Sequence, residues 1–227
     1  MKHAPWYITG TGTGTGKTVL TALLARFLRR AGRRVAALKP VCSGGRADAH
    51  ALHAALGGGL SLAEINPWHF RAALAPVLAA RRERRRVGRA QITAHLRRLQ
   101  KHFDWLLVEG AGGLLSPLGE QVDARDLIAA LRARPVIVGR NTLGVVNNLR
   151  LTLAALPPAA RARAVVVLMT PRRPDAATRT NARLLAEYFP AGRIFHIPWL
   201  GRPVDFEKAL KNARLRNRLS GILGDLP

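Results

Sequence analysis

A glycine-rich stretch near the start of the chain carries the clearest chemical signal in the sequence. Gly10–Thr18 reads Gly-Thr-Gly-Thr-Gly-Thr-Gly-Lys-Thr, between a short apolar run and an amphipathic one. Such glycines let backbone N–H groups point into one concavity, and a helix that begins there adds about half a positive charge. Lys17 can reach β- and γ-phosphates, and the Thr18 hydroxyl can bind Mg²⁺. The stretch therefore predicts a loop that binds the phosphates of a nucleoside triphosphate.

The spacing within this loop narrows its class. Five residues separate Gly10 from Gly16, one more than in the usual phosphate loop. One large class of long-loop ATPases, the partitioning and cell-division-site type, carries a second lysine five residues before the loop lysine. That position is Gly12 here, which counts against this class.

Two further motifs follow apolar runs that resemble strands. Lys39-Pro40-Val41-Cys42-Ser43-Gly44 follows the run 35–38, and Glu109-Gly110-Ala111-Gly112-Gly113 follows the run 105–108. The carboxyl ends of parallel strands line the ligand crevice, so we expect Lys39 and Glu109 beside the phosphate loop. A carboxylate there suits Mg²⁺, and a buried acid without a partner would be costly.

The elements that must position these motifs alternate between short apolar and longer amphipathic runs. We expect strands over 6–9, 35–38, 105–109, 136–138, 164–169 and 194–197, and helices over 18–28, 48–57, 90–102, 144–155 and 176–188, then a basic helical tail. The proline-containing stretch between 57 and 90 is expected to be irregular. The alternation predicts an α/β fold, a single doubly wound, mostly parallel sheet flanked by helices, in one domain over residues 1–227.

Composition bounds the setting of the protein. The 227 residues suit one well-buried domain. The single cysteine, Cys42, fits a reducing cytosol, and a strand-like start leaves no room for a signal peptide. No apolar run reaches the ~20 residues that span a bilayer. We therefore expect a cytoplasmic protein with no membrane partner.

The net charge of +24 is the least usual bulk property. Clustered cations can bind nucleic acid, but the densest run, Arg81–Arg86, has no aromatic residues within it and no nucleic-acid module around it. We interpret the charge as a solvated basic surface with no specific nucleic-acid partner.

The three motifs, in this order, resemble those of the dethiobiotin synthetases, which are ATP-dependent, P-loop NTPase-like ligases of biotin biosynthesis. The likeness runs along most of the chain. Further family-like residues are Asp48, Asn66-Pro67-Trp68-His69-Phe70, Leu143-Gly144 with Asn147, and Ile197-Pro198-Trp199-Leu200.

The resemblance implies a role for each matched residue. Lys39 and Lys17 would be the catalytic lysines, and Thr18, Asp48 and Glu109 would hold Mg²⁺. The nucleotide would be bound by Gly14, Thr15, Gly16, Lys17, Thr18, Val19, Asp48, Glu109, Gly110, Ala111, Gly112, Pro198, Trp199 and Leu200. Thr13 and Ser43 would contact a diamine, and Leu143, Gly144 and Asn147 would receive its carboxylate across a homodimer interface.

The implied reaction joins CO₂ to 7,8-diaminononanoate with ATP as co-substrate, through a carbamate and a carbamic-phosphoric anhydride. The partners implied are these small molecules and a second copy of the chain. Three anionic groups must meet, and Lys17, Lys39 and Mg²⁺ would offset their repulsion.

Several positions depart from the family pattern. Gly12 and Gly14 stand where the loop commonly carries acids, and Thr142 stands where a lysine is common. Leu168 and Met169 replace an Asn-Asp pair that reads adenine. An apolar strand end cannot bind the adenine edge through hydrogen bonds, so we expect weakened base selectivity.

Two other functions compete with this one. Amide-forming ligases of cobyrinate share the long loop but carry a glutaminase domain with a nucleophilic cysteine, and these 227 residues hold only Cys42. A partitioning-type ATPase that binds nucleic acid through its basic surface is favoured by the charge and opposed by Gly12 and Lys39–Gly44.

Overall fold

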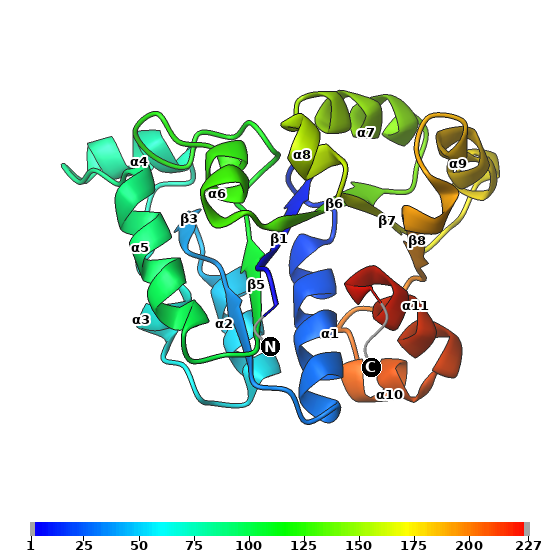
Figure 1. Cartoon of the computed structure of the whole chain (residues 1–227), viewed down its shortest axis with the longest axis horizontal. Coiled ribbons are helices and arrows are strands. Elements are labelled where there is room, and N and C mark those ends of the chain that lie inside the picture. The colour runs from blue at the N-terminus through cyan, green and yellow to red at the C-terminus, as the bar shows by residue number, and fades with distance from the viewer. Residues whose placement is uncertain (1–2, 225–227) are drawn as a thin grey trace.

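The computed structural model describes residues 3–224, in which six parallel strands form the main sheet (Figure 1). Their spatial order is β2 (Val35–Leu38), β5 (Trp105–Glu109), β1 (Trp6–Gly10), β6 (Arg134–Arg140), β7 (Val165–Met169) and β8 (Ile194–Ile197). The central strands are almost wholly buried, as expected where helices cover both faces of a parallel sheet. The predicted doubly wound fold is confirmed.

Helices cover the sheet in two layers, which lie above and below it in Figure 1. The lower layer groups α1 (Lys17–Arg30) with α2 (Ala47–Leu56), α10 (Phe206–Lys211) and α11 (Ala213–Leu223). The other layer contains α5 (Arg89–Gln100), at the left of Figure 1, and α6 (Ala124–Leu131), α7 (Val145–Ala154), α8 (Pro158–Arg161) and α9 (Ala176–Ala186), with the short 3₁₀ turn Ala191–Arg193 before β8. No described helix is long and apolar enough to cross a bilayer.

The stretch expected to be irregular is in fact structured, so that prediction was wrong. It contains α3 (Leu62–Ile65), β4 (Trp68–Phe70) and α4 (Pro76–Arg82), and β4 pairs in parallel with β3 (Val41–Ser43). Three-residue strands are too short to show an alternating pattern. This second sheet holds the segment that follows Lys39.

The register of the main sheet determines which motifs meet. Leu38 pairs with Val108, and Ile8 pairs with Glu109. Lys39 and Glu109 therefore leave neighbouring strands at the same edge, where the phosphate loop leaves β1. The sheet brings all three motifs together.

Gly139 lets α7 pack closely on the sheet, and this contact yields a first prediction. A Cβ there would lie 2.8 Å from Val145 Cγ2 and 3.3 Å from Leu149 Cδ2. Gly139→Ala should lower the free energy of unfolding by about 1–3 kcal/mol, because the overpacked helix must shift. The measurement is urea denaturation. Gly192→Ala is the control, since nothing lies within 4 Å of its Cβ, and an unchanged Gly139→Ala protein would contradict the packing argument.

Candidate functional site

The phosphate loop joins β1 to α1 and leaves its backbone donors available. Gly14 and Gly16 adopt positive φ values of 72° and 97°, which favour glycine. Gly16 caps α1 without any side-chain hydrogen bond. The N–H groups of the first turn of this 14-residue helix therefore face the site as an anion-binding terminus.

Gly10 is needed for close packing at the start of the loop. A Cβ on Gly10 would lie 2.5 Å from Thr15 Oγ1 and 2.9 Å from the Val138 carbonyl oxygen. Thr15 is buried, and its hydroxyl donates to the Gly12 carbonyl at 3.4 Å. The loop is thus held from within, by its own backbone and one threonine.

Lys17 lies along the inner side of this loop. Its side chain is buried, and Nζ donates to the Gly12 carbonyl at 2.7 Å. Burial, and next the charge of Lys39, lower the pKa of Lys17 to about 8, although Glu109 and Asp48 oppose the shift. This ammonium has no carboxylate partner in the described chain, so an arriving anion would stabilise its charge.

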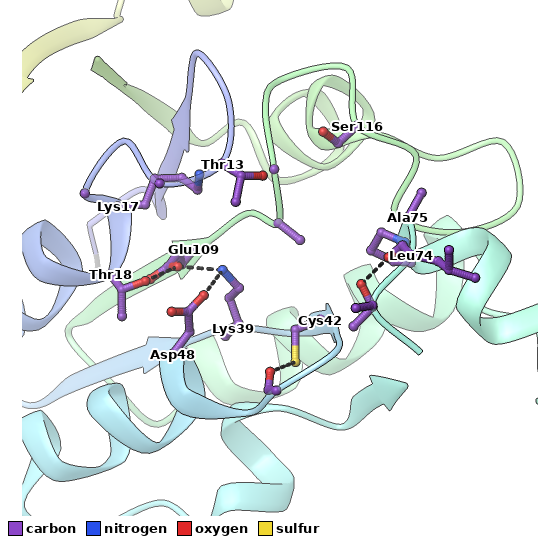
Figure 2. A pocket seen from close by; sticks show the side chains of 18 of the residues that line it. Thr13, Lys17, Thr18, Lys39, Cys42, Asp48, Leu74, Ala75, Glu109 and Ser116 are labelled. Carbon is purple, nitrogen blue, oxygen red and sulfur yellow. Dashed lines mark hydrogen bonds and ion pairs between the residues drawn. The ribbon is translucent and has the colours of Figure 1, made fainter. Parts of the chain in front are cut away.

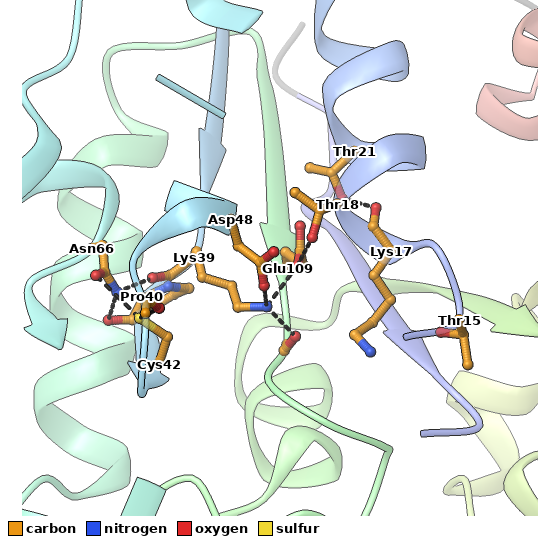
Figure 3. A network of polar contacts seen from close by, with 12 residues as sticks. Thr15, Lys17, Thr18, Thr21, Lys39, Pro40, Cys42, Asp48, Asn66 and Glu109 are labelled. Carbon is orange, nitrogen blue, oxygen red and sulfur yellow. Dashed lines mark hydrogen bonds and ion pairs between the residues drawn. The ribbon is translucent and has the colours of Figure 1, made fainter. Parts of the chain in front are cut away.

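Lys39 is the centre of a buried polar network (Figure 3). Nζ donates to Glu109 Oε1 at 2.6 Å, to Asp48 Oδ2 at 2.9 Å and to the Gly110 carbonyl at 3.2 Å. Burial alone would lower the pKa of Lys39, but the two carboxylates outweigh it and the net shift is upward. The lysine therefore stays charged inside the protein.

The turn that carries Lys39 is fixed by Asn66. This buried amide donates from Nδ2 to the Lys39 carbonyl at 2.6 Å, and its Oδ1 accepts from Arg46 Nε at 3.1 Å. The Cys42 thiol donates to the same oxygen at 3.3 Å. Asn66 lies at the end of α3, in the stretch that was predicted to be irregular, so sequence reasoning gave it no positioning role.

Three side chains in the site, Thr18, Asp48 and Glu109, carry oxygen atoms that suit a magnesium ion as ligands. The Thr18 hydroxyl donates to Glu109 Oε1 at 2.8 Å, and Asp48 also faces Lys39. Glu109 Oε2 is buried and has no hydrogen-bond partner among residues 3–224. An orphaned carboxylate oxygen next to a threonine hydroxyl is a suitable ligand pair for Mg²⁺, which takes few protein ligands and keeps water or phosphate for the rest. No group of three His, Cys, Asp or Glu in the described chain forms a closed metal site.

A cavity of about 680 Å³ opens over this network (Figure 2). Thr13, Lys17, Thr18, Lys39, Ser43, Asp48 and Glu109 line it, together with Gly14, Gly16, Val19, Ala111 and Gly112. Leu74, Ala75 and Ser116 form a wall that sequence reasoning did not identify. The Ser43 hydroxyl donates a hydrogen bond to the carbonyl oxygen of Leu74 in this wall.

A second cavity of about 320 Å³ adjoins the first, and Gly14 and Gly16 of the phosphate loop line both. It is lined by Thr15, Pro198, Trp199 and Leu200, which the resemblance assigns to the nucleotide, and by Arg140, Thr170, Arg172 and Arg202, to which it assigns no role. Met169 lines this cavity and lies against Gly16, whereas Leu168 is buried in the sheet.

Leu143, Gly144 and Asn147 lie apart from both cavities, at the start of α7. Leu143 is 85% exposed, and Gly144 caps the helix with a φ of 87°. Gly110 also faces away, since a Cβ there would meet the Tyr7 ring at 3.2 Å. Its carbonyl, rather than its Cα, is what reaches Lys39.

Comparison with known proteins adds a sequence relationship. A sequence model described as an AAA domain matches residues 5–204. The ATP-dependent dethiobiotin synthetase BioD of Anaeromyxobacter sp. (strain Fw109-5) is 43% identical, covering 71% of this chain and 72% of the relative. The corresponding protein of Anaeromyxobacter dehalogenans (strain 2CP-C) is 38% identical, covering 85% and 89%.

Solved structures share the fold at low identity. The MinD cell division protein of Aquifex aeolicus superposes with a TM-score of 0.60 at 13% identity, over 99% of this chain and 98% of that one. A ParA family ATPase from Chlorobium tepidum TLS gives 0.59 at 13% identity, over 96% of both chains. These likenesses establish a shared fold and nothing more specific.

The Lys39–Glu109 pair yields a second prediction. Lys39→Met leaves Glu109 as a buried, uncompensated charge, and the free energy of unfolding should fall by about 3–5 kcal/mol. The double variant Lys39→Met/Glu109→Leu removes both charges and should recover most of this loss. Urea denaturation of the two variants measures the cycle, with exposed Lys211→Met as the control. A double variant as unstable as the single one would refute the charge argument.

Proposed function

The chain belongs to the family of the ATP-dependent dethiobiotin synthetases, and we propose that residues 1–227 act as one domain that closes the ureido ring of dethiobiotin. The substrates in this proposal are 7,8-diaminononanoate, CO₂ and ATP. The observation that carries it is the charged Lys39, paired with Glu109 and Asp48 beside the phosphate loop. A cytoplasmic location is part of the proposal.

The reaction needs three bond-forming steps and no protein nucleophile. One amine of the diamine attacks CO₂ and loses a proton to give a carbamate. A carbamate oxygen attacks the γ-phosphorus of ATP, which releases ADP and leaves a carbamic-phosphoric anhydride. The second amine then attacks the carbamyl carbon and loses a proton, the ring closes, and inorganic phosphate leaves with the electron pair of the broken C–O bond.

The chain's part in these steps is electrostatic. The first turn of α1 and Lys17 bind the phosphates, and the loop glycines let them approach the backbone. Lys39 faces the same cavity and stabilises the charge on the carbamate and on the transferred phosphoryl group. Thr13 and Ser43, at the wall of this cavity, contact the diamine.

Mg²⁺ belongs to the proposal through Thr18, Asp48 and Glu109. When bound, the ion neutralises charge on the β- and γ-phosphates. The unpartnered Glu109 Oε2 supports this assignment. Lys39 forms an ion pair with each of the two carboxylates and balances part of their charge.

The smaller cavity is the proposed base site. Pro198, Trp199 and Leu200 would lie against the base together with Met169, while Thr15 and Val19 connect it to the phosphate loop. None of the lining side chains described is a carboxylate or an amide, and only the Thr15 and Thr170 hydroxyls carry both a donor and an acceptor, on a single atom each. We therefore propose weak selection among bases.

The last part of the proposal is a homodimer that completes the diamine site. Asn147 and Leu151 are four residues apart, so they share one side of α7, and Leu143 lies just before the Gly144 cap of this helix. Leu143 and Leu151 are 85% and 63% exposed. This side, with the α7 N-terminus at Gly144, would meet the partner and receive the substrate carboxylate.

An assay of the purified protein tests the reaction. With ATP, Mg²⁺, bicarbonate and the diamine, we expect phosphate release that requires the diamine and a product with the mass of dethiobiotin. Lys17→Ala should reduce turnover by at least ~100-fold, because a preorganised charge on the phosphates is lost. Each of the four common nucleoside triphosphates is tested in turn.

The same assay separates the competing function. Phosphate release that responds to DNA and not to the diamine would overturn the ligase proposal in favour of a partitioning-type ATPase. Measurement at two salt concentrations identifies nonspecific attraction of polyanions by the +24 charge, because that attraction falls steeply with salt.

The dimer makes a separate prediction. Leu151→Asp places a charge on the exposed side of α7, and we expect a monomer in light scattering together with a KM for the diamine raised by about tenfold or more. Nucleotide affinity should be retained, because neither cavity includes Leu151. Ala213→Asp adds the same charge at an exposed position of α11 and should change nothing. A Leu151→Asp protein that remains a dimer would exclude this interface.

A further inference from the structure

Arg202 connects the two cavities. It lies in the loop that follows β8, three residues after Trp199. The larger and smaller cavities share four of their described lining residues: Gly14, Gly16, Val19 and Arg202. Arg202 is the only one of the four with a charged side chain.

Arg202 lies where the base end and the phosphate end of a bound nucleotide would meet. The inference rests on the proposed function in one respect, namely that phosphates occupy the larger cavity and the base the smaller one. A molecule bound in this way crosses the boundary formed by Gly14, Gly16 and Val19, where Arg202 stands. The Arg202 guanidinium carbon lies 5.9 Å from the centre of the Trp199 ring, within range of a cation–π contact.

The partners of the charged residues around the larger cavity distinguish Arg202 from the two lysines there. Its cationic lining residues in the described chain are Lys17, Lys39 and Arg202. Lys39 is already matched by two carboxylates. Lys17 donates to a backbone carbonyl, and Arg202 is exposed with no ion pair to a carboxylate in residues 3–224.

The chemistry of the guanidinium suits a polyphosphate. Its planar fork of donors binds phosphate oxygens in pairs, which a lysine ammonium does not do. The phosphate loop itself, Gly10–Thr18, offers a single charged side chain, Lys17. A second cation from another part of the chain would share the charge of the triphosphate.

We propose that Arg202 binds the phosphate chain of the nucleotide and so sets affinity according to the number of phosphates. The base and phosphate sites are then joined by one loop, in which Trp199 contacts the base and Arg202 the phosphates. Arg202 is in this view a residue of the binding site that the phosphate-loop motif does not include.

Calorimetric titration tests this role without the diamine. ATP with Mg²⁺, ADP with Mg²⁺, AMP and adenosine are titrated into the wild-type chain and into Arg202→Ala, Arg202→Lys and Arg172→Ala. We expect Arg202→Ala to weaken ATP binding by about tenfold or more, as for a lost hydrogen bond to a charged group. Adenosine should bind as before, and Arg202→Lys should keep part of the ATP affinity.

Arg172→Ala is the matched control, because Arg172 is also exposed but lines only the smaller cavity. Its effect should be the same for ATP as for adenosine. Thermal unfolding of each variant checks that the fold is retained.

Three outcomes would overturn the inference. Unchanged ATP affinity in Arg202→Ala excludes a phosphate contact. An equal loss for adenosine and ATP means that Arg202 acts only through the Trp199 loop. A wild-type chain that binds ATP through Arg202 but forms no ureido product would refute the proposed reaction and leave this inference intact, whereas a chain that binds no ATP would refute both.

Discussion

The site depends on a lysine that is held charged inside the protein. Burial of Lys39 acts against its charge, and the Glu109 and Asp48 carboxylates more than compensate for that effect. The pairing is possible only because β2 and β5 are parallel neighbours, so that Lys39 and Glu109 follow Leu38 and Val108, which are in register. A shift of the register would leave a buried cation and a buried anion unpaired, and each would be costly.

The same pairing affects the second lysine. The charge of Lys39 adds to burial in lowering the pKa of Lys17. The two carboxylates lie closer to Lys39 than to Lys17, so Lys17 is left with a backbone carbonyl as its partner. The charge of Lys39 is thus balanced by two carboxylates of the protein. Among the described residues Lys17 has no such partner, so its charge is available to pair with an anion that binds. This difference fits a site that must take up phosphate while it keeps a fixed cation nearby.

The architecture by itself does not distinguish this chemistry from others. The MinD and ParA structures share the fold at 13% identity, and a fold can carry many functions. The residues that carry the proposed chemistry lie in the loops at the strand ends: the phosphate loop, the turn that begins at Lys39, and the segment from Pro198 to Arg202. The exposed arginine ion pairs on the surface, such as Arg81–Glu120, contribute little to stability.

The sequence by itself determined the phosphate loop, the order of the main strands along the chain and the residues Lys39, Asp48 and Glu109. All of these except Asp48 follow from local patterns, namely glycine spacing, apolar runs and the residue types at strand ends, whereas Asp48 was indicated by the family resemblance alone. The pairing β3–β4, the use of Asn66 to hold the Lys39 turn and the place of Arg202 between two cavities were decided by the tertiary structure. They depend on the approach of segments far apart in the chain, such as Cys42 with Asn66, which share a hydrogen bond, and Arg202 with the phosphate loop, which line one cavity. Such contacts form only when the sheet brings its strand ends together, so no local pattern records them.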